Sequence, residues 1–192
     1  LGQAIASNGD VAGYQNTDSF TSQATYWPFG GSGQTLGTLG GNTSVGYGVN
    51  ANGWVVGQSK DGDDNNIAFR WTSGGGMVSM GTLGGTTSVA NKINNSNEIV
   101  GTSFLGGGGF QAFTWNDTDG MVGVGPANSN GHDINESGQI TGSWLDAGSP
   151  SLFRYTPGSG NELLGRPDDT VQATGLGIGD NGDIVGYASP TG

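Results

Sequence analysis

The sequence predicts an all-β protein built from repeated four-stranded sheets, and three observations support this prediction. Glycine and proline make up roughly a quarter of the 192 residues, 41 and 6 respectively, a composition that disfavours helices. No segment shows helical periodicity over about 11 residues. A short hairpin pattern recurs five times, and its closing glycines are spaced 44, 44, 41 and 44 residues apart: Gly13, Gly57, Gly101, Gly142 and Gly186.

The first two strands of each repeat, called A and B here, form this hairpin. In the third repeat the pattern reads "ANKINNSNEIVGT" from Ala90, with apolar residues on both sides of a polar turn. The other turns read "SNGD", "ANGW", "ESGQ" and "DNGD". Asparagine and glycine tolerate the positive φ that a tight hairpin turn requires, so each of these segments predicts two antiparallel strands.

The third strand, C, ends in an aromatic residue 13 or 14 positions after each of the first four closing glycines. The fourth strand, D, is short and apolar and runs into a glycine-rich turn, as in "QTLGTLGG" from Gln34. Because the aromatic residues keep a constant place in the repeat, we expect them to fill the core between neighbouring sheets. These residues are Trp27, Trp71, Trp115 and Tyr155.

Four antiparallel strands per ~44 residues are typical of a β-propeller blade. We therefore expect one repeat array, with repeats at approximately 1–44, 45–88, 89–129 and 130–171 and a half-repeat at 172–192. A β-solenoid is the alternative, although this repeat is long for a single coil. The half-repeat carries strands A and B alone, which predicts either a longer propeller or completion by another chain, because unpaired strand edges are usually covered.

The charge excludes several classes of partner. The formal net charge is −11 and only 11% of residues are charged, so we expect binding neither to nucleic acid nor to anionic lipid. The chain has no cysteine, which excludes disulfides and thiolate metal sites. No apolar run reaches the roughly 18 residues of a membrane helix, so we expect no membrane insertion.

The motifs resemble those of the bacterial extracellular HAF-repeat family. "LGTLGG" at Leu36 and "MGTLGG" at Met80 match its first motif, and "SVANKINNSNEIVG" at Ser88 matches its second. "AFRW" at Ala68 and "AFTW" at Ala112 match its third, but the histidine of that motif is absent from all four repeats. The resemblance implies secretion or surface display in bacteria, and it implies no activity.

Catalysis is not expected, and no catalytic residue is assigned. The only histidine, His132, precedes a repeat hairpin, and most of the 16 acidic residues fall in turns, where aspartate serves turn geometry. Paired carboxylates near a propeller axis keep a glycoside-acting enzyme open as an alternative. The segment "KDGDDNN", residues 60–66, offers oxygen ligands for Ca²⁺ but lacks the closing acid of an EF-hand loop, so a solvated loop is expected and no metal site is assigned.

The connections between strands B and C differ in every repeat, whereas the A–B turns are short and uniform. They read "QNTDSFTS", "SKDGDDNN", "SFLGGGGF" and "SWLDAGSP". Variable loops on a repeat scaffold often bind ligands, and aromatic rings beside polar groups suit stacking on sugars. Packing of these rings on the blade or in a subunit contact is equally open. The predicted ligand-binding residues are Phe20, Lys60, Asp63, Asp64, Phe104, Phe110, Trp144 and Asp146.

These observations predict a secreted, non-catalytic binding or scaffold module at the cell surface or outside the cell, with a glycan or surface polymer as its partner. The alternative is a structural subunit of a homo-oligomer or filament, in which a neighbouring chain completes the half-repeat. Four Asn-x-Ser/Thr sequons are candidate surface glycosylation sites: Asn42, Asn94, Asn116 and Asn135.

Overall fold

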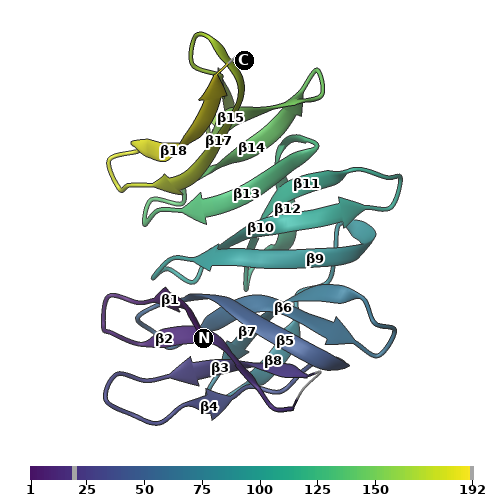
Figure 1. The fold of residues 1–192 in the computed structure, drawn as a ribbon, viewed down its shortest axis with the longest axis vertical. Coiled ribbons are helices and arrows are strands. Elements are labelled where there is room, and N and C mark those ends of the chain that lie inside the picture. Colours follow the sequence, from purple (N-terminus) through teal and green to yellow (C-terminus); the bar gives the residue numbers. More distant parts are fainter. Residues whose placement is uncertain (19–20, 191–192) are drawn as a thin grey trace.

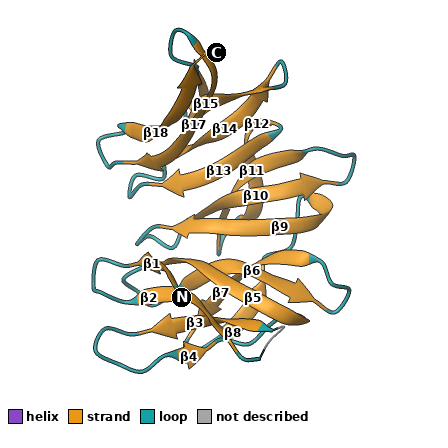
Figure 2. Ribbon diagram, viewed as in Figure 1, coloured by secondary structure: helices purple, strands orange, loops and turns teal. Residues whose placement is uncertain are grey.

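The protein is all-β, as the sequence predicts. The computed structural model describes residues 1–18 and 21–190. Strands make up 65% of the structure, and the described residues contain no helix. Strands alternate with turns throughout these described residues (Figure 2).

The strands follow the predicted order A, B, C, D through four repeats and A, B in a fifth. The first two repeats contain β1 (Gly2–Ile5), β2 (Val11–Asn16), β3 (Ser22–Trp27), β4 (Gln34–Thr35), β5 (Gly40–Val49), β6 (Val55–Asp61), β7 (Asn66–Thr72) and β8 (Gly76–Ser79). The next two contain β9 (Gly84–Ile93), β10 (Ile99–Leu105), β11 (Phe110–Asn116), β12 (Gly120–Ala127), β13 (Ser129–Ile134), β14 (Ile140–Asp146), β15 (Ser149–Thr156) and β16 (Gly160–Gly165). The last hairpin is β17 (Thr170–Ile178) and β18 (Ile184–Pro190).

Each repeat forms an antiparallel meander, and the sheets stack along the long axis of the molecule. The third sheet has the order β12-β11-β10-β9 and the fourth has the order β13-β14-β15-β16. The first two sheets are joined by one parallel pairing, Ser22 with Thr43. Figure 1 shows β1–β8 in the lower half, the third sheet above them, and the fourth sheet beside β17–β18 at the upper end. None of these sheets is closed.

The closing glycine of each hairpin is required by the close approach of strand A. A β-carbon on Gly101 would lie 2.0 Å from the carbonyl oxygen of Val89, and one on Gly57 would lie 1.9 Å from that of Val45. Only glycine fits at such distances. Strand A also starts earlier than the repeats drawn from the sequence: the boundaries after residues 44 and 88 fall inside β5 and β9.

The A–B turns owe their shape to residues with positive φ. Gly53 has a φ of 74°, and Asn97 takes the same place in the next repeat with a φ of 63°. Asparagine is one of the few non-glycine residues that adopt this left-handed conformation readily. The Asn- and Gly-rich turn segments therefore form the predicted hairpin turns.

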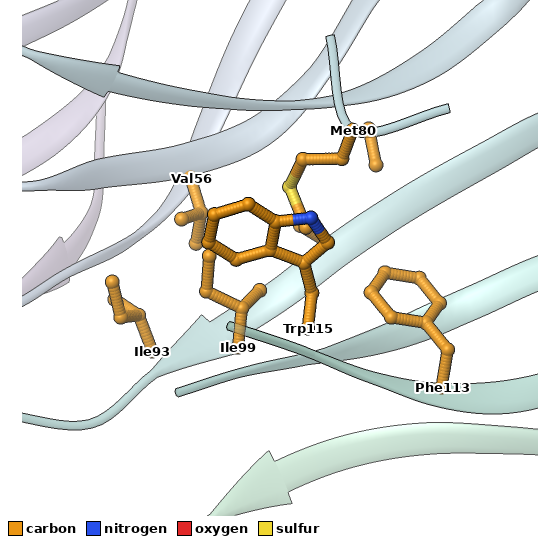
Figure 3. Close-up of a cluster of buried hydrophobic side chains, with 8 residues drawn as sticks. Val56, Met80, Ile93, Ile99, Phe113 and Trp115 are labelled. Carbon is orange, nitrogen blue, oxygen red and sulfur yellow. The ribbon is translucent and has the colours of Figure 1, made fainter. Parts of the chain in front are cut away.

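The hydrophobic core lies in layers between successive sheets. Trp115 packs with Val56 and Met80 of the second repeat and with Ile99 of its own repeat (Figure 3). The expectation of buried repeat aromatics is confirmed for Trp71 and Trp115, which are 4% and 9% exposed. Trp27 and Tyr155 are half-buried. Three phenylalanines two positions earlier in strand C are fully buried: Phe69, Phe113 and Phe153.

A row of buried asparagines links the A–B turns of successive repeats; we call Asn50, Asn94 and Asn135 the asparagine ladder. Each ladder side chain donates its Nδ2 hydrogen to a backbone carbonyl of the following repeat, at 2.9, 3.1 and 2.9 Å. The last acceptor is the carbonyl of Gly179, which has no side chain to extend the row. The ladder thus fixes neighbouring hairpins relative to one another.

Candidate functional site: a polar hollow along the free edge of β9

The candidate site is a hollow of about 300 Å³ beside strand β9. β9 is the edge strand of its sheet and pairs with β10 alone. Consecutive residues of β9 line the hollow although their side chains point to opposite faces of the sheet, so the hollow runs along the strand edge. It reaches three repeats, and its lining residues are Gln58, Asn66, Thr87, Ser88, Val89, Asn91, Thr102, Phe104, Asn130 and His132.

Seven of the ten lining residues carry an amide or a hydroxyl group, although more of the lining surface is apolar than polar. Hydrogen bonds hold two of the side chains in place. Asn91 donates through Nδ2 to the carbonyl of Gly131 at 2.7 Å. The Nδ1 atom of His132 lies 2.7 Å from the carbonyl oxygen of Gly175. Because a carbonyl only accepts, Nδ1 carries the proton in this contact, and Nε2 is an acceptor when the ring is neutral. The site therefore offers both donors and acceptors to a polar ligand.

Phe104 gives the hollow an apolar surface. Its side chain is 50% exposed, and it forms a cross-strand pair with Phe110, whose ring centroid lies 6.0 Å away. Two aromatic rings at this separation interact favourably and hold one another in place. A half-exposed ring supported from one side leaves its other side available to a ligand.

Gln58 is held at the hollow by a tyrosine of the neighbouring strand. Its Nε2 donates to the hydroxyl oxygen of Tyr47 at 3.1 Å. Burial raises the pKa of Tyr47, and the nearby Tyr14 raises it further, so the phenol remains neutral over the physiological range. The hollow is thus uncharged on this side.

The predicted residues of the second repeat lie together in the β6–β7 turn. Lys60 forms an ion pair with Asp64, with 3.3 Å between Nζ and Oδ1, and Asp63 is exposed beside them. Asp61 organises this turn, because its Oδ1 accepts the backbone N–H groups of Asp63 and Asn65 at 2.9 and 2.8 Å. The Asn65 bond is the main reason that the pKa of Asp61 is lowered.

The acidic residues of this turn therefore serve its geometry and a surface ion pair. Across residues 1–18 and 21–190, no group of three or more His, Asp or Glu side chains is placed to hold a metal ion. The Ca²⁺ hypothesis for residues 60–66 gains no ligand cluster from the structure.

The predicted residues of the fourth repeat lie on β14. Trp144 packs half-buried against the core cluster of Val100, Ala112 and Phe153, so it is part of the sheet and not of a loop. Asp146 is the last residue of β14, and its Oδ2 atom lies 3.8 Å from Nη2 of Arg166. Phe20 lies outside the described residues.

The structure brings together only some of the residues that the sequence singled out. Phe104 and Phe110 form a pair on the third sheet. The residues Lys60, Asp63 and Asp64 share the β6–β7 turn, and Trp144 and Asp146 lie on the fourth sheet. The B–C segments of the second, third and fourth repeats, all of which the structure describes, are mostly strand joined by tight turns, as at residues 105–110, and not long loops.

Sequence reasoning missed the polar residues of strand A, among them Asn91 and Asn130. These positions belong to the A–B hairpin pattern that recurs in every repeat, so they do not stand out in the sequence. The available signal was the residue after the glycine or alanine of strand A, which changes from Tyr47 to Asn91 to His132 along the repeats while its surroundings stay similar. In a repeat protein, a position whose side chain varies between otherwise similar repeats is a candidate for ligand contact.

No protein-family model matches the sequence, and no curated protein matches it. The described chain contains no helix with the length and hydropathy that a membrane crossing requires.

Proposed function

We propose that the protein is a secreted, non-catalytic binding module that recognises a neutral glycan or surface polymer in the hollow along β9. The observation that carries this proposal is a half-exposed phenyl ring, Phe104, beside a wall of amide and hydroxyl groups. Binding sites for polar ligands combine an apolar surface with a few convergent polar groups in this way. The net charge of −11 favours a neutral ligand over an anionic one.

We further propose that the stacked sheets belong to a β-propeller of the HAF-repeat kind. Antiparallel meanders packed on one another, with strand A at one edge of the third and fourth sheets, support this arrangement. A β-solenoid pairs strands of successive coils in parallel, and the single parallel pairing between the first two sheets gives it little support. The resemblance to HAF repeats supports a place outside the cell or on its surface.

The glycan proposal is tested by titrating the ¹⁵N-labelled chain with neutral oligosaccharides built from glucose, mannose, xylose or N-acetylglucosamine. We expect one series to shift the amide signals of Asn91, Phe104 and His132. Replacing Phe104 by alanine should weaken that binding about tenfold, which corresponds to about 1.4 kcal/mol. The matched control is Phe29→Ala, since Phe29 is 80% exposed on the first repeat and away from the hollow.

Three results would overturn the proposal. They are an absence of shifts with every series, shifts confined to other strands, and equal affinity of wild type and the Phe104→Ala variant.

A structural subunit is the second candidate, and the uncovered face of β17–β18 favours it. Val185 and Tyr187 are 68% and 53% exposed, whereas Val56 and Val100, which hold the place of Val185 in earlier repeats, are fully buried. Covering by a second copy would remove this apolar surface from water. Light scattering over a range of protein concentrations tests the structural role. A dimer or filament that dissociates on Val185→Lys substitution supports this role, and a monomer at all concentrations contradicts it.

A further inference from the structure

A second hollow, of about 540 Å³, lies between the third and fourth sheets on the side of the A–B turns. It is distinct from the hollow along β9. Trp115, Thr114 and Glu98 of the third repeat line it together with Tyr155 and Gly138 of the fourth. One position of strand C contributes most clearly to this hollow, because its side chain is short here and long at the other interfaces between repeats.

That position is the residue before the terminal aromatic of strand C, and it points toward the following repeat. In the first repeat it is Tyr26, whose hydroxyl group lies close to Gly53 of the next turn. In the fourth repeat it is Arg154, which donates through an Nη1 hydrogen to the carbonyl of Gly182 at 3.1 Å. Both long side chains reach from their own sheet to the following repeat.

In the second repeat the position is Arg70, and its surroundings show what this space holds. The guanidinium carbon lies 5.2 Å from the centroid of Trp54 and 5.0 Å from that of Trp115, distances typical of cation–π contacts. An Nη2 atom lies 3.3 Å from a carboxylate oxygen of Asp117 in the following repeat. A guanidinium group is thus seated between two aromatic rings and a carboxylate.

In the third repeat the position is Thr114, which is too short to cross to the fourth sheet. The strand pairings establish the equivalence, since Val100 is opposite Thr114 as Val56 is opposite Arg70. The space that an arginine occupies one repeat earlier is therefore open, and it is the hollow.

The walls of the hollow still carry groups that suit a cation, although in a different arrangement. Tyr155 takes the place of Trp115, Glu98 that of Trp54 and Pro157 that of Asp117, so one aromatic ring and one carboxylate face the space. The side chain of Glu98 is held by a 2.7 Å hydrogen bond from Nδ2 of Asn94, and it lies against Gly138 of the fourth repeat. A second carboxylate, Asp119, lines the outer part of the hollow.

From this juxtaposition we propose that the hollow between the third and fourth sheets binds a guanidinium group, as carried by an arginine side chain of a peptide partner or by a small guanidino compound. The ligand's planar cation lies against Tyr155 and pairs with Glu98. The guanidinium suits this site better than an ammonium group does, because it stacks on rings and forms paired hydrogen bonds with a carboxylate.

The first test is a calorimetric titration of the chain with N-acetyl-L-arginine amide, with N-acetyl-L-citrulline amide as the neutral control of the same shape. We expect the arginine derivative to bind at least tenfold more tightly than the citrulline derivative and more tightly than N-acetyl-L-lysine amide. Agmatine distinguishes the two sources of the ligand: equal affinity indicates a free guanidino compound, and weaker binding indicates an arginine within a peptide. Equal affinity for arginine and citrulline derivatives overturns the proposal.

Two variants locate the site. Thr114→Arg supplies the chain's own guanidinium, so it should abolish binding of the arginine derivative and raise Tm. Glu98→Gln keeps an oxygen acceptor for Asn94 and should weaken binding at least tenfold, even where Thr114→Arg fails to fold. The matched control is Asp168→Asn, which removes the same unit of charge at an exposed position in the β16–β17 connection. Equal weakening by Glu98→Gln and Asp168→Asn would show a nonspecific charge effect and contradict the proposal.

Discussion

Asn50 donates a 2.9 Å hydrogen bond from Nδ2 to the backbone carbonyl of Asn94, which lies 44 residues further along the chain. The Oδ1 atom of the same side chain accepts the backbone N–H groups of Asn52 and Trp54, so one residue both closes its own turn and reaches the next repeat. Asn94 and Asn135 repeat this pattern. The repeat length in the sequence therefore matches the separation of the two residues that each of these hydrogen bonds joins.

Replacing Asn94 by alanine removes two turn bonds, the bond to the Glu98 side chain and one bond between repeats at a position that is 3% exposed. Buried acceptors and donors left without partners are costly, so we expect the free energy of unfolding to fall by about 2–4 kcal/mol. Urea denaturation measures this loss. The control Asn161→Ala, at an exposed position of β16, should change stability by less than about 0.5 kcal/mol. An Asn94→Ala variant that unfolds at the wild-type urea concentration contradicts the role of the ladder.

The ladder also decides which sequons are accessible. Asn94 and Asn135 are 3% and 4% exposed and their amides are hydrogen-bonded, whereas Asn42 is exposed and Asn116 is half-buried. A chain glycosylated on a ladder residue cannot form these contacts. In a glycosylating host we expect the folded, secreted fraction to carry glycan on Asn42 or Asn116 alone, as measured by mass spectrometry of glycopeptides. Glycan on Asn94 in that fraction would refute the prediction.

The pair Tyr26–Asp10 predicts a loss of stability at both extremes of pH. The Tyr26 hydroxyl donates to Oδ2 of Asp10 at 2.7 Å, and this bond is the main cause of the lowered pKa of Asp10. The stabilising contribution of Asp10 is therefore present above its ordinary pKa of 3.8 and is lost as the pH falls through the lower folded value. Burial and the bond to Asp10 raise the pKa of Tyr26 to about 12, so its contribution is present below pH 10.0 and is lost as the pH rises toward 12.

Thermal unfolding across this pH range tests the pair. Tyr26→Phe should lower the free energy of unfolding at neutral pH by about 1.5–3 kcal/mol, the usual worth of a hydrogen bond to a charged group. It should also flatten the decline of Tm on both the acid and the alkaline side. Tyr187→Phe is the control, because Tyr187 is 53% exposed. Parallel pH profiles for wild type and Tyr26→Phe would count against the assignment.

The closing glycines predict a sharp difference between two alanine substitutions in the third repeat. A β-carbon on Gly101 would lie 2.0 Å from the Val89 carbonyl oxygen and 2.7 Å from the ring of Phe113, so strand A would have to move. We expect Gly101→Ala to destabilise the protein by about 4 kcal/mol or more. Gly107, in the following turn, has open space around it and an ordinary φ, so Gly107→Ala should be close to neutral. Calorimetric Tm values for the two variants decide the matter, and similar values would contradict the prediction.

The sequence predicted the strand order well because each strand is defined by local patterns. The Asn- and Gly-rich turns, the closing glycines such as Gly101 and the terminal aromatics such as Trp115 each act within one repeat. Whether the array closes into a ring was not predictable in the same way, because ring closure depends on the angle between neighbouring sheets. Side chains such as Arg70 and Tyr26 contact the following repeat, so their role is not visible in the pattern of a single repeat.

The candidate site was predicted only in part, and for the same reason. Phe104 was predicted because an aromatic residue in a variable B–C segment can be recognised from the sequence alone. Asn91 and His132 were not found as partners of Phe104, since they come from two strands that stacking alone brings together. The open space left by Thr114 is visible in the sequence only after Arg70 has been recognised as the side chain that fills the equivalent interface.

Because each ladder asparagine joins only two adjacent turns, the molecule resists mechanical force one interface at a time. A pulling force applied to the two ends of the described chain loads the interfaces between repeats in series, and the weakest yields first. We expect the interface beside Thr114, where an open hollow replaces a crossing side chain, to yield before the interface that contains Arg70. Extension at constant speed should therefore give a sawtooth of separate ruptures, in which the third and fourth sheets separate before the second and third sheets. A guanidinium ligand in the hollow should delay the separation of the third and fourth sheets.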